Sequence, residues 1–224
     1  MDEFEFLYGI LKDLQKHGLL DKVILIGSWC QYFYRHQYNQ PKEIPATRTK
    51  DADFLIPKRL HLAKNIDLAA LLRGHDLEEF HNRETKVTKF KHPSLDIEFL
   101  TDPGPKSDET GYYFKNLNIV AQELHFMSIP LRYNQIIKYK ELTLRLPEPE
   151  AFALHKLIIS QRRLNPDKKV KDIKTAQGMF AFFEGKGNHI KRLHEIINDM
   201  SKSWRKKVEQ ALKECDIEFV LQKK

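Results

Sequence analysis

Residues 23–28 constrain the fold more than any other stretch of the chain. Val23-Ile24-Leu25-Ile26 is a short, fully apolar run, which predicts a strand buried on both faces. Gly27 allows a tight turn, and Ser28 is a good N-cap for the aromatic-rich helix expected next. This arrangement directs free backbone N–H groups and the positive end of a helix at one point, which suits a phosphate group. Many such turns hold no ligand, so Gly27 and Ser28 are candidates only in combination with other signals.

Two aspartates lie one residue apart on a second predicted strand. The strand spans residues 50–56 and stops at Pro57. Side chains alternate along a strand, so Asp51 and Asp53 share one face, with Cα atoms roughly 6–7 Å apart. Their carboxylates can converge on one small, hard cation, which relieves the cost of burying them side by side. The alternative is a pair of solvated acids on an edge strand.

A third acid-bearing strand is predicted over residues 94–100. Asp96 and Glu98 share one face and apolar residues share the other, a pattern that a plain amphipathic strand also explains. If this strand pairs beside residues 50–56, it brings a third carboxylate to the aspartate pair. A two-metal centre needs that arrangement, with ions roughly 3.5–4 Å apart. Strand alternation does not separate Asp96 from Glu98, because both point the same way.

A helix that is apolar around most of its circumference is expected at residues 149–163. Pro147-Glu148-Pro149-Glu150 gives a helix-start signal immediately before the apolar run. Lys156, Ser160 and Arg163 form a narrow polar stripe at i, i+4 and i+7. A lysine in so apolar a helix needs an anion or a route to water, so a phosphate partner and simple snorkelling both explain Lys156.

Periodicity predicts several further elements. The helix opened by Pro166 is expected to carry Val170 inward and Asp172 outward. Residues 112–146 alternate too loosely for their elements to be assigned. Helices are also expected at about 3–17 and 66–73 and around 190–197 and 204–215, strands at about 76–81 and 85–91, and loops at 37–48 and 101–111.

Charge and cysteine content limit the class of protein. A chain of 224 residues that is 41% hydrophobic can form one domain or two small ones. The net charge of +7 permits an anionic partner such as a nucleotide or a nucleic acid, although a generically basic protein explains it equally well. Cys30 and Cys215 form neither a disulfide framework nor a zinc pattern. The acidic N-terminus lacks the order of a signal peptide and no apolar run approaches about 20 residues, so we expect a cytoplasmic protein without a membrane span.

The order of the motifs resembles the nucleotidyltransferase superfamily, which has a polymerase-beta-like fold. The superfamily pattern is Gly-Gly or Gly-Ser after an apolar residue, then Asp-x-Asp between apolar residues, then a later apolar-flanked acid. Here Gly27-Ser28 is followed after 22 residues by Asp51-Ala52-Asp53, and then by Asp96-Ile97-Glu98.

Local stretches also look like a bacterial nucleotidyltransferase-like family of unassigned substrate. These stretches are Ile26–Cys30, Ile97–Leu100 and Ala151–Leu157, with Arg162-Arg163 and Lys171-Asp172. The order Lys156, Arg163, Asp172 is in addition distantly similar to AbiEii-type toxins, in which a helical lysine contacts phosphates.

The resemblance implies roles for individual residues. Gly27 and Ser28 would cradle the β- and γ-phosphates of an NTP, and Asp51 and Asp53 would bind two Mg²⁺ or Mn²⁺ ions. The third carboxylate would be Asp96 or Glu98, because the family resemblance favours Glu98 and the usual preference for aspartate favours Asp96. The remaining implied nucleotide contacts are Lys156 with Ser160 and Arg163 on its stripe, and Arg48 and Lys50 beside the acids.

We therefore expect an α/β (α+β) protein. A nucleotidyltransferase-type mixed sheet with flanking helices would occupy residues 1–146, a C-terminal helical bundle would occupy residues 147–224, and the active cleft would lie between them. The expected activity is transfer of an NMP from an NTP to the hydroxyl of a tRNA-like RNA, a protein or a small molecule, with release of pyrophosphate. One alternative is a non-catalytic nucleotide- or nucleic-acid-binding module on the same fold. The other is an Asp-x-Asp glycosyltransferase, which the upstream Gly-Ser turn and the short chain disfavour.

Overall fold

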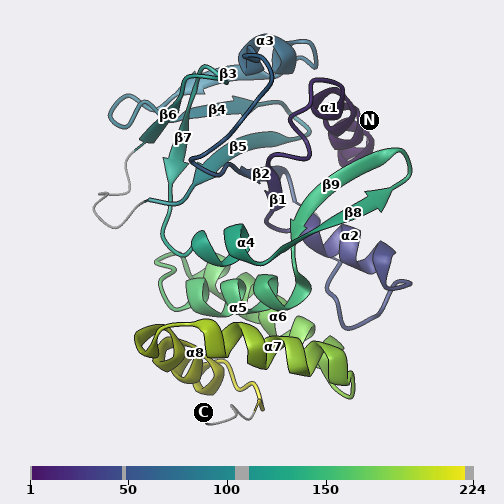
Figure 1. The fold of residues 1–224 in the computed structure, drawn as a ribbon, viewed down its shortest axis with the longest axis vertical. Helices are drawn as coiled ribbons and strands as arrows, with labels where there is room; N and C mark the ends of the chain where they lie inside the picture. The colour runs from purple at the N-terminus through teal and green to yellow at the C-terminus, as the bar shows by residue number, and fades with distance from the viewer. Residues whose placement is uncertain (1, 47–48, 104–110, 220–224) are drawn as a thin grey trace. The chain divides into compact units, whose positions relative to one another are not determined.

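The computed structural model describes residues 2–46, 49–103 and 111–219. Contacts between residues divide the chain into two compact units. The sheet unit contains Met1–Cys30 and Thr47–Leu146, and the helical unit contains Gln31–Ala46 and Pro147–Lys224. The expected division into domains at residues 146 and 147 stays a prediction. The expected α/β class is confirmed, because a mixed sheet with flanking helices forms the core of the structure (Figure 1).

The sheet unit consists mainly of strands, with helices between some of them. The observed elements confirm the first amphipathic helix and the strands that carry the acids, and they supply the assignment of residues 112–146 that periodicity could not give. The elements are α1 (Glu3–Lys16), β1 (Ile24–Ile26), β2 (Asp51–Leu55), α3 (Leu68–Arg73), β3 (Glu78–His81), β4 (Thr88–Lys91), β5 (Asp96–Thr101), β6 (Gly111–Phe114), β7 (Ile119–Glu123), α4 (Ser128–Arg132), β8 (Asn134–Tyr139) and β9 (Leu142–Pro147). Helix α2 (Trp29–Gln37) starts in this unit and crosses into the helical unit.

Within the described residues the strands form one nine-stranded mixed sheet. Its main path runs β3-β4-β5-β2-β1-β9-β8, and β7 pairs with β5 and with β6. Strands β2 and β5 pair in parallel, so the strand predicted at 94–100 does lie beside the strand predicted at 50–56. Strand β1 pairs antiparallel with β2, so the turn that follows β1 lies near the beginning of β2. Figure 1 shows β5, β2 and β1 side by side.

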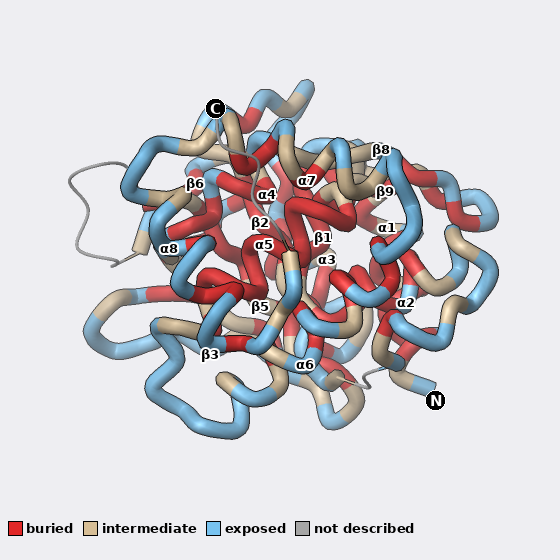
Figure 2. The backbone as a smooth tube through the Cα atoms, turned by 90° about the horizontal axis from the view of Figure 1, so that it is seen from below, coloured by how far each residue is buried: buried red, intermediate tan, exposed pale blue. Residues whose placement is uncertain are grey.

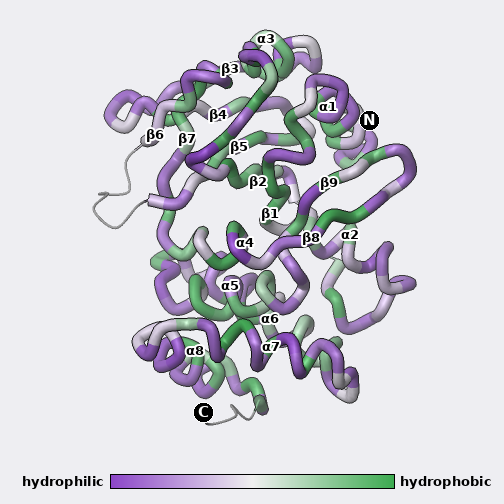
Figure 3. The backbone as a smooth tube through the Cα atoms, in the orientation of Figure 1, coloured by the Kyte–Doolittle hydropathy of each residue, from purple (hydrophilic) through white to green (hydrophobic). Residues whose placement is uncertain are grey.

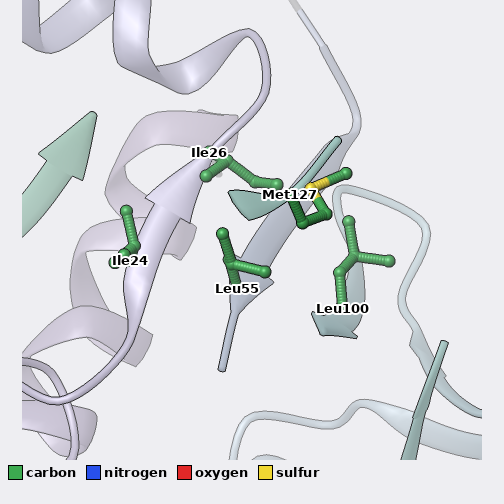
Figure 4. Close-up of a cluster of buried hydrophobic side chains, with 5 residues drawn as sticks. All are labelled: Ile24, Ile26, Leu55, Leu100 and Met127. Atoms are coloured by element: carbon green, nitrogen blue, oxygen red, sulfur yellow. The ribbon is translucent and has the colours of Figure 1, made fainter. Parts of the chain in front are cut away.

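Both faces of the central strands are covered by apolar side chains. On one face the rings of Phe54 and Phe99 stack with centroids 5.6 Å apart. On the other face Ile24, Ile26, Leu55, Leu100 and Met127 form a buried cluster (Figure 4). Figures 2 and 3 show the same central strands as buried and hydrophobic. Since all of β1 and the C-terminal parts of β2 and β5 are buried, these strands provide a rigid base for the side chains at their ends.

The helical unit is built around α5 (Pro149–Ser160). This helix is buried along almost its whole length and contacts the helices that follow, α6 (Pro166–Phe183), α7 (Gly187–Asp199) and α8 (Lys202–Glu214). Helix α5 ends three residues before the predicted position. The side chain of Asn165 caps α6 and the side chain of Ser201 caps α8.

Two expectations about α6 were wrong. Val170 was expected inward, but 49% of it is exposed, and Asp172 was expected outward, but only 3% of it is exposed. The periodic pattern treated every charged residue as solvent-facing. Asp172 is buried because two cations neutralise it, which pattern analysis does not detect. Throughout the described ranges, the helices are too short or too polar to traverse a bilayer.

Candidate functional site

Gly27 forms a turn that only glycine fits easily. Its φ of +78° lies in the left-handed region, and a Cβ atom added at this position would lie 2.6 Å from Asp53 Oδ2. The carboxylate of Asp53 therefore rests against the backbone of the turn. This contact places the Gly-Ser motif and the Asp-x-Asp motif next to one another, as the superfamily resemblance implies.

Ser28 follows at the start of helix α2. It is buried, with 8% of its surface exposed, and α2 begins at the next residue. The first backbone N–H groups of a helix have no partner within the helix, and they carry the positive end of its dipole. The turn can therefore offer N–H donors to a phosphate oxygen.

The four candidate acids lie on one face of two neighbouring parallel strands. Asp51 of β2 is in register with Asp96 of β5, and Asp53 is in register with Glu98. Leu55, two residues further along the same face, is completely buried in the apolar cluster, Asp53 is half-buried, and Asp51 is exposed. The acids thus line the solvent end of a face whose other end is hydrophobic core.

Glu98 and Asp96 differ in their partners. Lys89 of β4 places its Nζ 2.7 Å from Glu98 Oε1, because the antiparallel register sets these two residues opposite each other. Asp96 is held through its backbone, where its N–H donates to the carbonyl of Lys50 at 2.5 Å. Among the residues that the structure describes, no ion-pair partner contacts the Asp96 carboxylate. Lys89 was not singled out from the sequence, because only the pairing of β4 with β5 brings it to Glu98.

The donor set fits a hard divalent cation in kind. Asp51, Asp53 and Asp96 offer carboxylate oxygens from one face, which is the ligand type that Mg²⁺ prefers. In the described ranges, however, no three acidic, histidine or cysteine side chains are gathered closely enough to hold a metal ion. A cation at this site would have to draw the carboxylates together by changes in their side-chain conformations. The two-metal centre stays a prediction.

Of the two basic candidates beside the acids, Lys50 lies within the described residues and Arg48 does not. Lys50 immediately precedes β2, and its Nζ donates to the carbonyl of Pro93 at 3.4 Å. The ammonium group of Lys50 is therefore held near the entry to β2 and β5, at the exposed end of the acidic face.

In the helical unit, Lys156 and Arg163 share one buried carboxylate. Lys156 Nζ lies 2.8 Å from Asp172 Oδ1, and Arg163 Nε lies 2.7 Å from Asp172 Oδ2. Burial opposes ionisation of Asp172, but the charges and hydrogen bonds of the two cations outweigh it and lower the pKa of the carboxyl below its ordinary value. The three groups together carry one excess positive charge.

The neighbouring His155 stays neutral. Burial, reinforced by the charge of Lys156, lowers the pKa of its imidazole to about 3. Within the described part of the chain, its Nε2 atom has no hydrogen-bond partner. His155 therefore adds no positive charge to the cluster at neutral pH.

Ser160 is buried among other side chains of the helical unit. It is completely buried, and its Oγ donates to the carbonyl of Leu157 at 2.8 Å and lies 3.9 Å from Cys215 Sγ. Its predicted role in nucleotide binding would require this residue to become accessible. The nucleotide-binding roles of Lys156, Ser160 and Arg163 all stay predictions.

Comparisons with known proteins bear on the fold and the class. A model of the nucleotidyltransferase family matches residues 6–199. No curated protein matches the chain. Among solved structures, an antigenic nucleotidyltransferase-like protein from Paracoccidioides brasiliensis shares 15% identity, with 95% of this chain and 94% of that chain covered and a TM-score of 0.46. The solution structure of the antibiotic-resistance factor ANT(2'')-Ia shares 10% identity, with coverage of 96% and 100% and a TM-score of 0.48.

The similarity to AbiEii-type toxins stays a prediction from short motifs. The family match is of a different kind, because it spans the sheet unit and most of the helical unit. It includes the Gly-Ser turn, both acid-bearing strands and the cluster around Lys156. The chain therefore belongs to the nucleotidyltransferase family.

Proposed function

We propose that this protein is a metal-dependent nucleotidyltransferase that transfers an NMP from an NTP to an acceptor hydroxyl. The observation that carries the proposal is the contact between the Gly27 turn and Asp53, with Asp51 and Asp96 on the same face. A phosphate-binding turn beside a row of carboxylates is the minimum that a triphosphate and a divalent cation require.

Each group of residues has a role in the proposed reaction. The N–H groups after Gly27 and Ser28 bind phosphate oxygens of the NTP. Asp51, Asp53 and either Asp96 or Glu98 would hold Mg²⁺ or Mn²⁺, which when bound would neutralise charge on the triphosphate and favour ionisation of the attacking hydroxyl. The acceptor oxygen forms a bond to the α-phosphorus, the bond from that phosphorus to the bridging oxygen breaks, and pyrophosphate leaves. The acceptor proton passes to the third carboxylate.

The helical unit supplies the other candidate phosphate contacts. Two cations share the single carboxylate of Asp172, so the cluster has one positive charge to offer an anion. Lys156 is mostly buried, whereas the Arg163 side chain is 38% exposed and is the more accessible of the two. Within this unit, Lys156 and Arg163 are the candidates for contact with a phosphate, and Asp172 holds both in place.

A binding module on the same fold is the second candidate function. Two observations favour it: Lys89 already neutralises Glu98, and in the described ranges the acids are not gathered into a metal cluster. Such a module would bind an NTP at the Gly27 turn without transferring it.

The decisive experiment follows label from α-³²P-NTPs. The protein is incubated with each NTP, Mg²⁺ or Mn²⁺, and separate pools of RNA, protein and small molecules. We expect label on one pool for the wild type and none for Asp51→Asn/Asp53→Asn. The matched control is Asp76→Asn, which removes an exposed carboxylate at φ +58°, a conformation that asparagine also adopts.

The outcomes separate the two candidate functions. Transfer that survives the double substitution would contradict the site assignment. NTP binding without transfer to any pool would favour the binding module. Loss of transfer in the Asp76 control as well would show that the loss reflects charge or folding and not the acidic face.

A further inference from the structure

The net charge of the protein resides entirely in the helical unit. The residues of that unit include 19 Lys and Arg against 12 Asp and Glu, which gives +7. The residues of the sheet unit include 19 of each kind, which gives zero. A generically basic protein would spread its excess over both units, so this segregation indicates a localised electrostatic function.

The segment 162–174, here called the basic tip, holds more Lys and Arg than any other stretch of 13 residues in this unit. It joins the end of α5 to the first half of α6 and contains six Lys and Arg against two Asp. Asp172 is buried, and both of its oxygens are occupied by Lys156 and Arg163. Asp167 alone remains as an exposed acid within the tip.

The lysines of the tip are exposed or half-buried, and three of them are regularly spaced. Lys168, Lys171 and Lys174 recur every third residue, so they are neighbours along the first turns of α6 over about 9 Å. In the part of the chain that the structure describes, Lys168, Lys169 and Lys174 have no ion-pair partner. These three unpaired cations on one helix match a polymer with repeated negative charges.

We propose that the basic tip binds the phosphodiester backbone of RNA. The binding does not depend on nucleotidyl transfer, but the choice of RNA rests on the proposed function, because RNA carries acceptor hydroxyls next to its phosphates. The guanidinium group of Arg162 and the ammonium groups of Lys168 and Lys169 suit phosphate oxygens. The apolar side chains exposed at the tip are Leu164 and Val170, too small an area for the apolar face that a membrane-bound helix buries.

The test is fluorescence anisotropy of the full chain with a labelled single-stranded RNA of about 20 nucleotides, without NTP. We expect salt-dependent binding, since each phosphate contact contributes about −0.7 to the slope of log K against log salt on single strands. Lys168→Glu/Lys169→Glu should weaken binding at least about tenfold and reduce the magnitude of the slope by about 1.4. Lys168→Gln/Lys169→Gln should also weaken RNA binding and reduce the salt slope, but by less than the Glu pair does.

The matched control reverses two exposed cations of the sheet unit, Arg83→Glu/Lys86→Glu, in the turn between β3 and β4. It changes the net charge by the same amount as the tip reversal. Equal weakening by both double variants would overturn the proposal, because binding would then follow net charge alone. Circular dichroism verifies that each variant is folded. If the Lys168→Glu/Lys169→Glu variant is unfolded, the RNA affinity of the Lys168→Gln/Lys169→Gln variant tests the proposal instead.

Two further measurements distinguish RNA from other partners, and failure of this inference from failure of the proposed function. Binding of the same sequence as DNA but not as RNA, or binding only to vesicles that contain phosphatidylserine, would overturn the proposal. Asp51→Asn/Asp53→Asn should bind RNA as the wild type does. If RNA binding depends on the tip while no label is transferred, the proposed function fails and this inference stands. If label is transferred while tip reversal leaves RNA binding unchanged, this inference fails and the proposed function stands.

Discussion

At the scale of single residues, the candidate site contains a glycine that meets two structural requirements at once. Gly27 adopts a left-handed conformation, and it also lies against the carboxylate of Asp53. Gly18 meets only the first requirement, since its φ is +71° and an added Cβ would meet nothing within 4 Å. The pair separates the cost of backbone strain from the cost of displacing the carboxylate.

We predict that Gly27→Ala is more harmful than Gly18→Ala. Each substitution should cost about 1–2 kcal/mol of unfolding free energy for the left-handed conformation. Gly27→Ala must in addition move Asp53, so it should lower nucleotidyl transfer at least about tenfold, whereas Gly18→Ala should leave transfer unchanged. Urea unfolding and α-labelled NTP assays measure the two effects. Equal activity of the two variants would show that the contact with Asp53 has no role in the reaction.

A second prediction concerns the buried imidazole of His155. Its pKa in the folded chain is about 3, below the ordinary value of 6.5. Between these two pH values, His155 is therefore protonated in the unfolded chain and neutral in the folded chain. Stability from this group is complete above pH 6.5 and is lost as the pH falls from 6.5 towards 3. The loss is about 1.4 kcal/mol per pH unit within that window.

Urea unfolding at pH 7.5, 6.5 and 5.5 checks this expectation. His155→Phe, which keeps an aromatic ring without a titrating group, should flatten the pH dependence over this range. The exposed His61 provides the control, and His61→Gln should retain the wild-type dependence. A profile that stays as steep in His155→Phe as in the wild type would assign the pH dependence to other groups.

At the scale of elements, the pairing of β2, β5 and β4 gives the two candidate third acids different neighbours. Strand alternation in the sequence placed Asp96 and Glu98 on one face and could not rank them. The parallel register shows that Asp96 lies beside Asp51 and Glu98 beside Asp53, and the pairing of β4 brings Lys89 to Glu98. This information comes from pairing between distant strands, which local patterns do not contain.

We predict that Asp96→Asn lowers transfer more than Glu98→Gln does. Glu98 is already engaged by Lys89, whereas the carboxylate of Asp96 has no such partner in the described ranges. The Lys89–Glu98 pair is partly solvated, so its loss should cost at most about 1 kcal/mol of stability. The ratio of kcat/KM for the two variants measures the difference. A larger loss for Glu98→Gln, which Lys89→Met does not reproduce, would make Glu98 the third acid.

At the scale of the whole molecule, local signals predicted much of the sheet unit and less of the helical unit. The Gly-Ser turn, the Asp-x-Asp strand and the third acidic strand were found from sequence because glycine, alternation and apolar runs are local properties. Asp172 was misplaced because its burial depends on Lys156, which is 16 residues away and on another helix. Residues 112–146 were not assigned because β6 to β9 are short and partly exposed, and pairing with the rest of the sheet stabilises them.

A ligand that binds only the folded chain tests the site through the stability of the whole molecule. We predict that an NTP with Mg²⁺ raises the melting temperature of the wild type, because binding at 100 times Kd contributes about 2.7 kcal/mol to folding. Mg²⁺ alone should contribute little, since in the described residues the acids are not gathered into a metal cluster before the triphosphate arrives. The shift should vanish in Asp51→Asn/Asp53→Asn and persist in Asp76→Asn. A full shift with NTP and EDTA would contradict metal-dependent binding, because the Gly27 turn and the basic residues would then suffice to hold the triphosphate.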